Sequence, residues 1–480
     1  MKRLNETLDA LDGHLFSPPR AERGSRAFQW IFLAALFLLG AWFWARFLNQ
    51  GRLRLTAEDW PRQCEYFSVL AQAVTDGRIP WHVSRQFYGI DSFLGVPELV
   101  LSPQILLLPF MDAGRFVLVN VLLLYAVGFA GLLLIRRRWR LSAAAFALLF
   151  LLFNFNGHII SHLAVGHQWY GYFFLPFFLL LAFEMAEGKR GLRLPILTAL
   201  ALNAILLQGS FHMMNWCLIF LALMILFIPA ARRAGLWALL FTALLAAWRV
   251  VPGAIELHGG GYSFRNGYPS LYDLFLGLTR MYGPDGPQIG GIVGPERWWE
   301  YDLYIGLPAL TLLLGLGIAV RRLRSWRLEG TRFQPLDAPM IAMAICSLGY
   351  FWAVVAMLPI PLANVERVSS RFLLIPFLML LVIACARAQE GLDRLGRWRW
   401  LCLPLLAEIG FELFNHARLW RLSELERLQP IMPYDVSIRI IERAEPLYQW
   451  GTSAAAVLSL ATLAALLVLL IGRKDETLTR

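Results

Sequence analysis

Long uninterrupted runs of apolar residues are the feature that most limits what this chain can fold into. Residues 28–48 form one such run, and residues 451–471 form another. A helix needs about 20 apolar residues to cross a hydrocarbon core of roughly 30 Å, and an open-ended segment can satisfy its backbone there only as a helix. With 58% hydrophobic and 16% charged residues, the chain carries too little charge to cover the surface of a soluble protein of 480 residues. We therefore expect a membrane protein.

The runs predict an all-α, polytopic fold with about twelve transmembrane helices in a single membrane domain, residues 28–471. Cytoplasmic tails are expected at 1–27 and 472–480, and the first span is expected to be an uncleaved anchor. The predicted spans are about 28–48, 114–135, 141–157, 169–186, 194–208, 211–230, 236–251, 303–320, 340–358, 371–388, 400–415 and 451–471.

Basic residues set the predicted orientation. With the N-terminus inside, the inner loops are strongly basic, as at Arg136–Arg140, Lys189–Arg190 and Arg321–Arg324, whereas the outer segments together are slightly acidic. The net charge of +11 then follows from topology and from anionic lipid headgroups, so nucleic acid is not an expected partner. The sequence predicts a bacterial cytoplasmic (inner) membrane protein with both termini inside and an active site that faces outward.

Polar residues gather in three outer segments, about 49–113, 252–302 and 416–449. Apolar residues recur at helical spacing over Glu58–Asp76, which predicts an amphipathic helix lying on the membrane surface. Seven of the eight histidines fall on the outer side or at outer ends of spans, which favours a polar cavity that opens outward. They are His82, His158, His162, His167, His212, His258 and His416.

Glu58 and Asp59 follow the first span, at the start of that amphipathic helix. Acids in a first turn complement the helix dipole, and Pro61 suits an early helical position, so helix capping is one reading. The other is a general base at the membrane interface, where a carboxylate removes the proton of an attacking hydroxyl. Spacing alone leaves both open.

Two further groups of polar residues recur at i,i+4 spacing. His158 and His162 would share a helix face and could bind zinc, although the sequence shows no third ligand. Glu408 and Glu412 step along the span at 400–415 toward His416. Acids at that depth face a water-filled cavity or a partner charge. Candidate partners are Arg249 and Arg46.

Arg367 and Arg371 flank Ser369 and Ser370 near the start of the span at 371–388, on the predicted outer side. The positive-inside rule does not account for them there. Two guanidinium groups one helical turn apart could bind a phosphate at the level of the headgroups, whereas the alternative is ordinary contact with lipid phosphate.

A series of short motifs runs along the chain in a fixed order. They are Glu58–Tyr66, Asp76–Trp81, Gly89, Ser102–Pro103, Gly166–His167 ahead of Leu175–Pro176, Tyr301–Leu307 and Arg367–Phe372. Taken in this order, over roughly residues 55–375, they resemble the motifs of GT-C membrane glycosyltransferases, with the bacterial YfhO-like branch the closest. A serine pair stands where the family pattern "R-x-P-x-R-F" has a proline, and no large C-terminal soluble domain follows.

The resemblance implies an enzyme that moves a sugar from a polyprenyl-phosphate-linked donor to an extracytoplasmic acceptor, with inversion. The acceptor would be a cell-envelope glycan, lipid or protein. Asp59 would be the base, with Glu58 its neighbour or a metal ligand, and Arg367 and Arg371 would bind the donor phosphate. The remaining implied pocket residues are His162, His167, Glu300 and Tyr301. A cofactor is not required by the sequence, although some GT-C enzymes use a divalent cation.

Two other classes compete with this hypothesis. A transporter or lipid flippase would explain twelve spans and intramembrane acids, but the sequence shows no related halves. A non-catalytic assembly factor of the same fold is the other alternative, and the presence of Glu58 and Asp59 argues mildly against it. Fold alone does not decide between them, because function depends on the site.

Overall fold

The structure is a computed structural model, and it describes residues 10–19, 23–167, 169–256, 266–290, 294–319, 334–357, 366–392 and 394–472. His258 and Arg321–Arg324, both used in the predictions above, lie outside these ranges. The chain divides into two compact units, each assembled from three stretches of sequence. Unit 1 comprises Met1–Gln50, Val121–Ala164 and Phe264–Arg427, and unit 2 comprises Gly51–Asn120, Val165–Ser263 and Leu428–Arg480.

Unit 1 is a helical bundle built around α5, a helix with no charged residue whose side chains are almost all buried. Helices α2, α15 and α16 pack against α5. A two-stranded antiparallel sheet joins β3 (Ile289–Gly290) to β4 (Pro295–Glu296). The helices are α2 (Arg23–Phe47), α4 (Ala113–Trp139) from Val121 onward, α5 (Ala143–Phe155), α6 (Gly157–Ala164), α11 (Leu271–Thr279), α12 (Leu307–Leu314), α13 (Asp337–Cys346), α14 (Gly349–Val355), α15 (Leu374–Leu392), α16 (Cys402–Leu419) and α17 (Leu422–Leu428).

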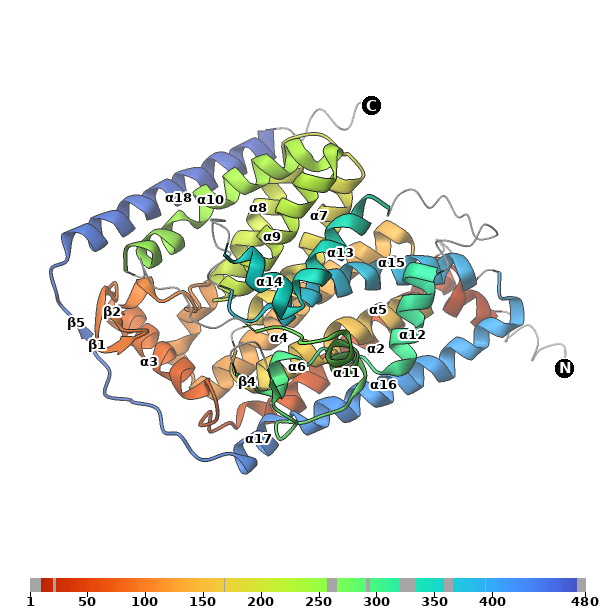
Figure 1. The fold of residues 1–480 in the computed structure, drawn as a ribbon, viewed down its shortest axis with the longest axis horizontal. Helices are drawn as coiled ribbons and strands as arrows, with labels where there is room; N and C mark the ends of the chain where they lie inside the picture. Colours follow the sequence, from red (N-terminus) through yellow and green to blue (C-terminus); the bar gives the residue numbers. More distant parts are fainter. Residues whose placement is uncertain are drawn as a thin grey trace. The chain divides into compact units, whose positions relative to one another are not determined.

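Unit 2 contains a group of long helices and a small sheet. Helices α10 and α18 lie side by side, and α8 also packs against α10 (Figure 1). In the sheet, β1 (His82–Phe87) pairs antiparallel with both β2 (Ile90–Ser92) and β5 (Ile440–Ile441), so a segment late in the chain pairs with one that closely follows α3. The helices are α3 (Trp60–Asp76), the start of α4 up to Asn120, α7 (Leu175–Ala186), α8 (Arg193–Leu207), α9 (Phe211–Phe227), α10 (Arg232–Glu256) and α18 (Pro446–Gly472).

Six helical segments in the described ranges are long and apolar enough to cross a membrane. Four shorter apolar helices are also present, including α8 and α9, which the turn at Gln208–Ser210 separates as predicted. These segments support an all-α membrane protein, whereas the count of twelve spans and their orientation stay predictions. The six are Ser25–Phe47, Ala113–Trp139, Ala143–Ala164, Pro229–Glu256, Ser369–Leu392 and Pro446–Gly472.

The predicted span at 340–358 is not one continuous helix. Helix α13 ends at Cys346, Leu348 has extended backbone angles, and α14 begins at Gly349. Tyr268 pairs with the chain at this break, because its N–H donates to the carbonyl of Ser347 and its carbonyl accepts from the N–H of Gly349. A neighbouring strand-like segment thus satisfies the backbone groups that the interrupted helix leaves open.

The predicted amphipathic helix is α3, and it begins with Trp60 and Pro61 as expected. Its apolar face does not lie open to a membrane surface. Trp60, Phe67 and Leu70 are buried, and Phe67 packs edge-on against Phe116 of α4. The apolar periodicity was read as lipid contact, but it reflects packing against the rest of unit 2.

Candidate active site

Asp59 immediately precedes α3 in unit 2, at the N-cap position. Its side chain makes no capping hydrogen bond to the helix. Instead, one carboxylate oxygen lies 3.1 Å from Nε2 of His167, a residue more than 100 positions later in the chain. The Asp59 side chain keeps 36% of its surface exposed, whereas His167 keeps 14%. The result is an accessible carboxylate whose orientation is set by an imidazole.

Backbone contacts hold these two residues together. The N–H of Asp59 donates to the carbonyl of Val165, and Gly166 packs against the start of α3. Gly166 has a φ of +84°, and a Cβ at this position would lie 2.7 Å from the backbone nitrogen of Trp60. Only glycine fits both conditions. Glu58 also has a positive φ of 52°, a conformation that costs a non-glycine residue about 1–3 kcal/mol and often occurs at functional sites.

The guanidinium group of Arg62, in the first turn of α3, adds a positive charge to the site. Nη2 of Arg62 lies 3.7 Å from Asp59, and its Nη1 donates to the hydroxyl of Tyr88. That hydroxyl donates in turn to Glu98 over 2.7 Å. Burial and the nearby Glu98 carboxylate raise the pKa of Tyr88 well above its ordinary value, so Tyr88 stays protonated. The chain of contacts fixes Arg62 beside the candidate base.

Unit 1 contains a second polar cluster, centred on Glu300. Arg371 donates to both Glu300 oxygens from Nε and Nη2, each over 2.6 Å, and both side chains are buried. Nε2 of His162 lies 3.8 Å from Glu300. The structure therefore brings together two predicted pocket residues, His162 and Glu300, and a predicted phosphate-binding residue, Arg371. The planar guanidinium of Arg371 binds the carboxylate of Glu300. Arg367 is therefore the better candidate for binding the donor phosphate that the resemblance implies.

Arg367 is half-buried in a segment that pairs with Asn266. Its carbonyl accepts from the N–H of Asn266, whose side chain donates to Glu296. Burial and the Glu300 charge raise the pKa of Glu296, and Asn266, Arg367 and Arg371 oppose that rise. Tyr301 is fully buried next to this cluster, and burial together with Glu296 and Glu300 raises its pKa.

The two acids and one histidine that recur at i,i+4 spacing along α16 have different environments. Glu408 is exposed, Glu412 is half-buried with an oxygen 3.4 Å from the hydroxyl of Tyr304, and His416 is fully buried. Nε2 of His416 lies 3.0 Å from Oδ2 of Asp302. Asp302 is not among the predicted site residues. Its one weak signal in the sequence is that it is an acid directly before the predicted span 303–320, where an acid usually has a partner.

Arg249 was considered as a partner for Glu408, but its guanidinium binds backbone carbonyls. Nη1 donates to Leu94, and Nη2 donates to Val96 and Pro97, over 2.8–2.9 Å. Arg249 is buried inside unit 2, where it holds the backbone of the short segment that follows β2.

The predicted zinc pair, His158 and His162, is buried in α6 with ring centroids 4.2 Å apart. Nδ1 of His162 lies 2.9 Å from the carbonyl of His158, a hydrogen bond typical of a structural histidine. Among the described residues, neither belongs to a group of three metal-ligating side chains. Asp59 and His167 offer two ligand atoms of types that divalent metals bind, without a third such ligand in the described ranges.

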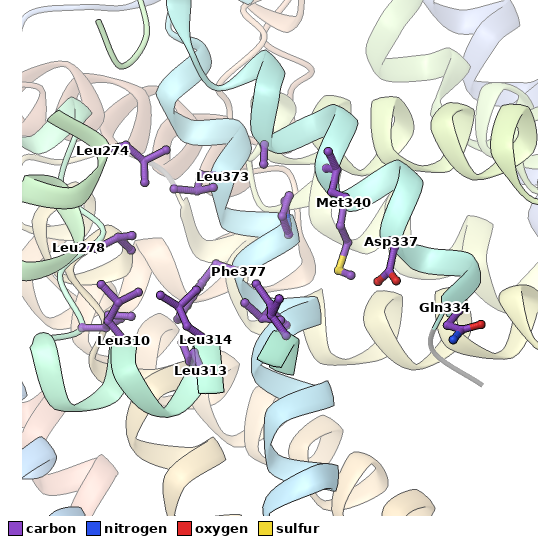
Figure 2. A pocket seen from close by; sticks show the side chains of 16 residues that line it. Leu274, Leu278, Leu310, Leu313, Leu314, Gln334, Asp337, Met340, Leu373 and Phe377 are labelled. Atoms are coloured by element: carbon purple, nitrogen blue, oxygen red, sulfur yellow. The ribbon is translucent and has the colours of Figure 1, made fainter. Parts of the chain in front are cut away.

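An apolar cavity of about 590 Å³ lies within unit 1 (Figure 2). Leu274, Leu278 and Leu310 line one side, while Asp337 and Gln334 lie at the other end. The volume is within the range of small-ligand sites, and the lining is almost entirely aliphatic. Such a cavity suits a hydrocarbon chain rather than a sugar.

No family model, curated protein or solved structure matches this chain. The two polar clusters, the apolar cavity and the order of the sequence motifs are the features that bear on its function. Within each unit, the geometry groups residues that the resemblance had selected from separate motifs. Asp59 lies with His167, and Glu300 lies with Arg371 and His162.

Proposed function

We propose that this protein is an integral-membrane glycosyltransferase of the GT-C type. It transfers a sugar from a polyprenyl-phosphate-linked donor to a hydroxyl of an envelope glycan, lipid or protein outside the cytoplasmic membrane, with inversion. The observation that carries the proposal is the contact between Asp59 and His167. A partly exposed carboxylate that does not cap its helix, but is oriented by an imidazole, has the arrangement of a general base.

In the proposed reaction, the acceptor hydroxyl oxygen attacks the anomeric carbon of the donor sugar from the face opposite the phosphate. The bond between that carbon and the phosphate oxygen breaks, and the polyprenyl phosphate leaves with the bonding electrons. Asp59 takes the hydroxyl proton as the new bond forms. His167 keeps the carboxylate oriented, and Arg62 adds positive charge on its other side.

Arg367 binds the donor phosphate in this proposal, and Arg371 holds Glu300 in place. The apolar cavity of unit 1 accepts part of the lipid tail. A divalent cation, if the enzyme uses one, would be held by Asp59 and His167 with Glu58 nearby in the chain, and it would neutralise charge on the leaving phosphate.

The test is transfer by the purified full-length protein, given polyprenyl-phosphate sugars and envelope lipid or glycan acceptors. Asp59→Asn keeps the size of the side chain and removes its basicity, so transfer should fall by about 10²–10⁴-fold. Asp76→Asn, an exposed carboxylate at the other end of α3, is the matched control and should keep wild-type activity. Equal rates for wild type and a folded Asp59→Asn would remove Asp59 from the mechanism.

A second candidate function is lipid or solute transport. The interruption between α13 and α14 favours it, because transporters often bind substrates at broken helices. Uptake or lipid scrambling by the protein in vesicles, unchanged in Asp59→Asn, together with absence of sugar transfer, would support transport over catalysis.

A further inference from the structure

Three side chains of unit 2 come together, two from the β1–β2 hairpin and one from the segment before α18. His82 begins β1, Asp91 lies in β2, and Glu445 directly precedes α18. One ligand atom from each lies within 4.8 Å of the others, and no other group of three metal-ligating residues occurs in the described ranges. His82 is fully buried, whereas the side chains of Asp91 and Glu445 are 22% and 34% exposed. The group is thus partly open to solvent on its carboxylate side.

The two ring nitrogens of His82 have different neighbours. Nδ1 lies 3.2 Å from Oδ1 of Asp91, whose Oδ2 accepts from Arg443 over 2.7 Å. Nε2 lies 3.5 Å from Oε2 of Glu445, which is longer than an ordinary hydrogen bond. Neither of these last two atoms has a hydrogen-bond partner among the described residues. Buried polar atoms are normally satisfied, so the pair points to a ligand that both atoms bind.

The spacing of the pair matches two ligands of one metal ion. Zinc binds imidazole nitrogen at about 2.0–2.1 Å and carboxylate oxygen at about 2.0–2.2 Å, so two ligands at a tetrahedral angle are roughly 3.4 Å apart. The observed separation is 3.5 Å. A metal-bound histidine usually donates its other N–H to a carboxylate, and Asp91 stands at that position beside His82.

We propose that Nε2 of His82 and Oε2 of Glu445 bind one divalent cation of the zinc class, with water completing its coordination. Asp91 is a positioning residue that orients the imidazole and is itself held by Arg443. Imidazole favours zinc and related transition metals over calcium and magnesium. The ion links the first outer segment to the start of α18, next to the pairing of β1 with β5, and it does not depend on the proposed sugar transfer.

The test is zinc binding by the full-length protein in detergent, after removal of metal with a chelator. Calorimetric titration with Zn²⁺ should show one site per chain, and zinc should raise the melting temperature by mass action. Glu445→Gln should weaken binding by more than about 100-fold and Asp91→Asn by about 10–100-fold. Glu442→Gln, an exposed acid three residues earlier that pairs with Arg78, is the matched control and should bind zinc as the wild type does.

X-ray absorption at the zinc edge of the wild-type protein keeps the test independent of variant folding. It should show only nitrogen and oxygen ligands, including one imidazole. Wild-type protein that binds no zinc, or equal affinity in wild type and Glu445→Gln, would overturn the proposal. In that case His82 and Glu445 form a structural contact in unit 2, and Glu445→Gln lowers the melting temperature in the absence of metal.

Discussion

The guanidinium of Arg371 and the carboxylate of Glu300 form a bidentate ion pair in which both side chains are at least 95% buried. Parallel N–H···O bonds of this kind are strong and fix the orientation of both groups. Removing one partner leaves a buried charge without compensation, which costs far more than the pair contributes. The pair therefore has a structural role that can be separated from phosphate binding.

Glu300→Gln should destabilise the protein by about 3–5 kcal/mol, because it leaves the buried guanidinium without its counter-ion. The double variant Glu300→Leu/Arg371→Met should recover most of that loss, since it removes both charges. The melting temperature of the purified protein measures both effects. If the double variant is as unstable as the single one, the ion pair is not the source of the loss.

Arg367→Gln should affect the donor rather than stability. A charge-assisted hydrogen bond is worth about 1.5–3 kcal/mol, so the KM for the polyprenyl-phosphate donor should rise about 10- to 100-fold with an unchanged melting temperature. Arg280→Gln, an exposed arginine of the same unit, is the control and should leave this KM unchanged. A normal donor KM in Arg367→Gln would exclude the assigned role.

Gly166→Ala tests the close contact that places His167 beside Asp59. The new Cβ would lie 2.7 Å from the backbone nitrogen of Trp60 and would also be strained by the positive φ. Gly77→Ala provides the comparison, because Gly77 has a positive φ of 62° with no atom within 4 Å of the added carbon. We expect Gly77→Ala to cost about 1–2 kcal/mol and Gly166→Ala clearly more, with loss of transfer activity. Similar effects of the two changes on stability and activity would contradict the importance of the contact.

The sequence predicted the mainly helical, apolar character of the chain, because apolar runs and turn residues act locally. The turn between α8 and α9 and the start of α3 at Pro61 followed from neighbouring residues. Periodicity could not tell which apolar faces meet protein and which meet lipid, so the covered face of α3 was assigned to the membrane. The break before α14 was also missed, since it depends on pairing with the distant residue Tyr268.

The site was only partly predictable, for the same reason. Contacts such as that between Asp59 and His167 depend on tertiary folding, which spacing along the chain does not encode. The resemblance selected both residues, but it assigned Arg371 to a phosphate, whereas the structure pairs it with Glu300. The residues around Asp302 form no motif that marks it as a site residue, although its side chain is fully buried against His416.

Glu296→Gln should make stability less dependent on pH. Burial and the Glu300 charge raise the pKa of Glu296 above its ordinary value of 4.5, although Asn266 and two arginines limit the rise. Because the folded state then binds the proton more tightly than the unfolded state, Glu296 contributes most to stability below pH 4.5 and loses that contribution as the pH rises through its folded pKa. The glutamine variant keeps an oxygen to accept from Asn266 and has no charge to bury.

The variant should therefore melt at a higher temperature than the wild type at pH 7, and the advantage should disappear as the pH falls to about 4. Melting curves of both proteins between pH 4 and pH 8 measure this directly. Glu442→Gln removes an acid that is 90% exposed and should change stability little at any of these values. If the wild type is more stable than Glu296→Gln at pH 7, the attraction of Arg367 and Arg371 for the Glu296 carboxylate exceeds the cost of burying its charge. Glu296 is then held ionised and balances the charge of Arg367.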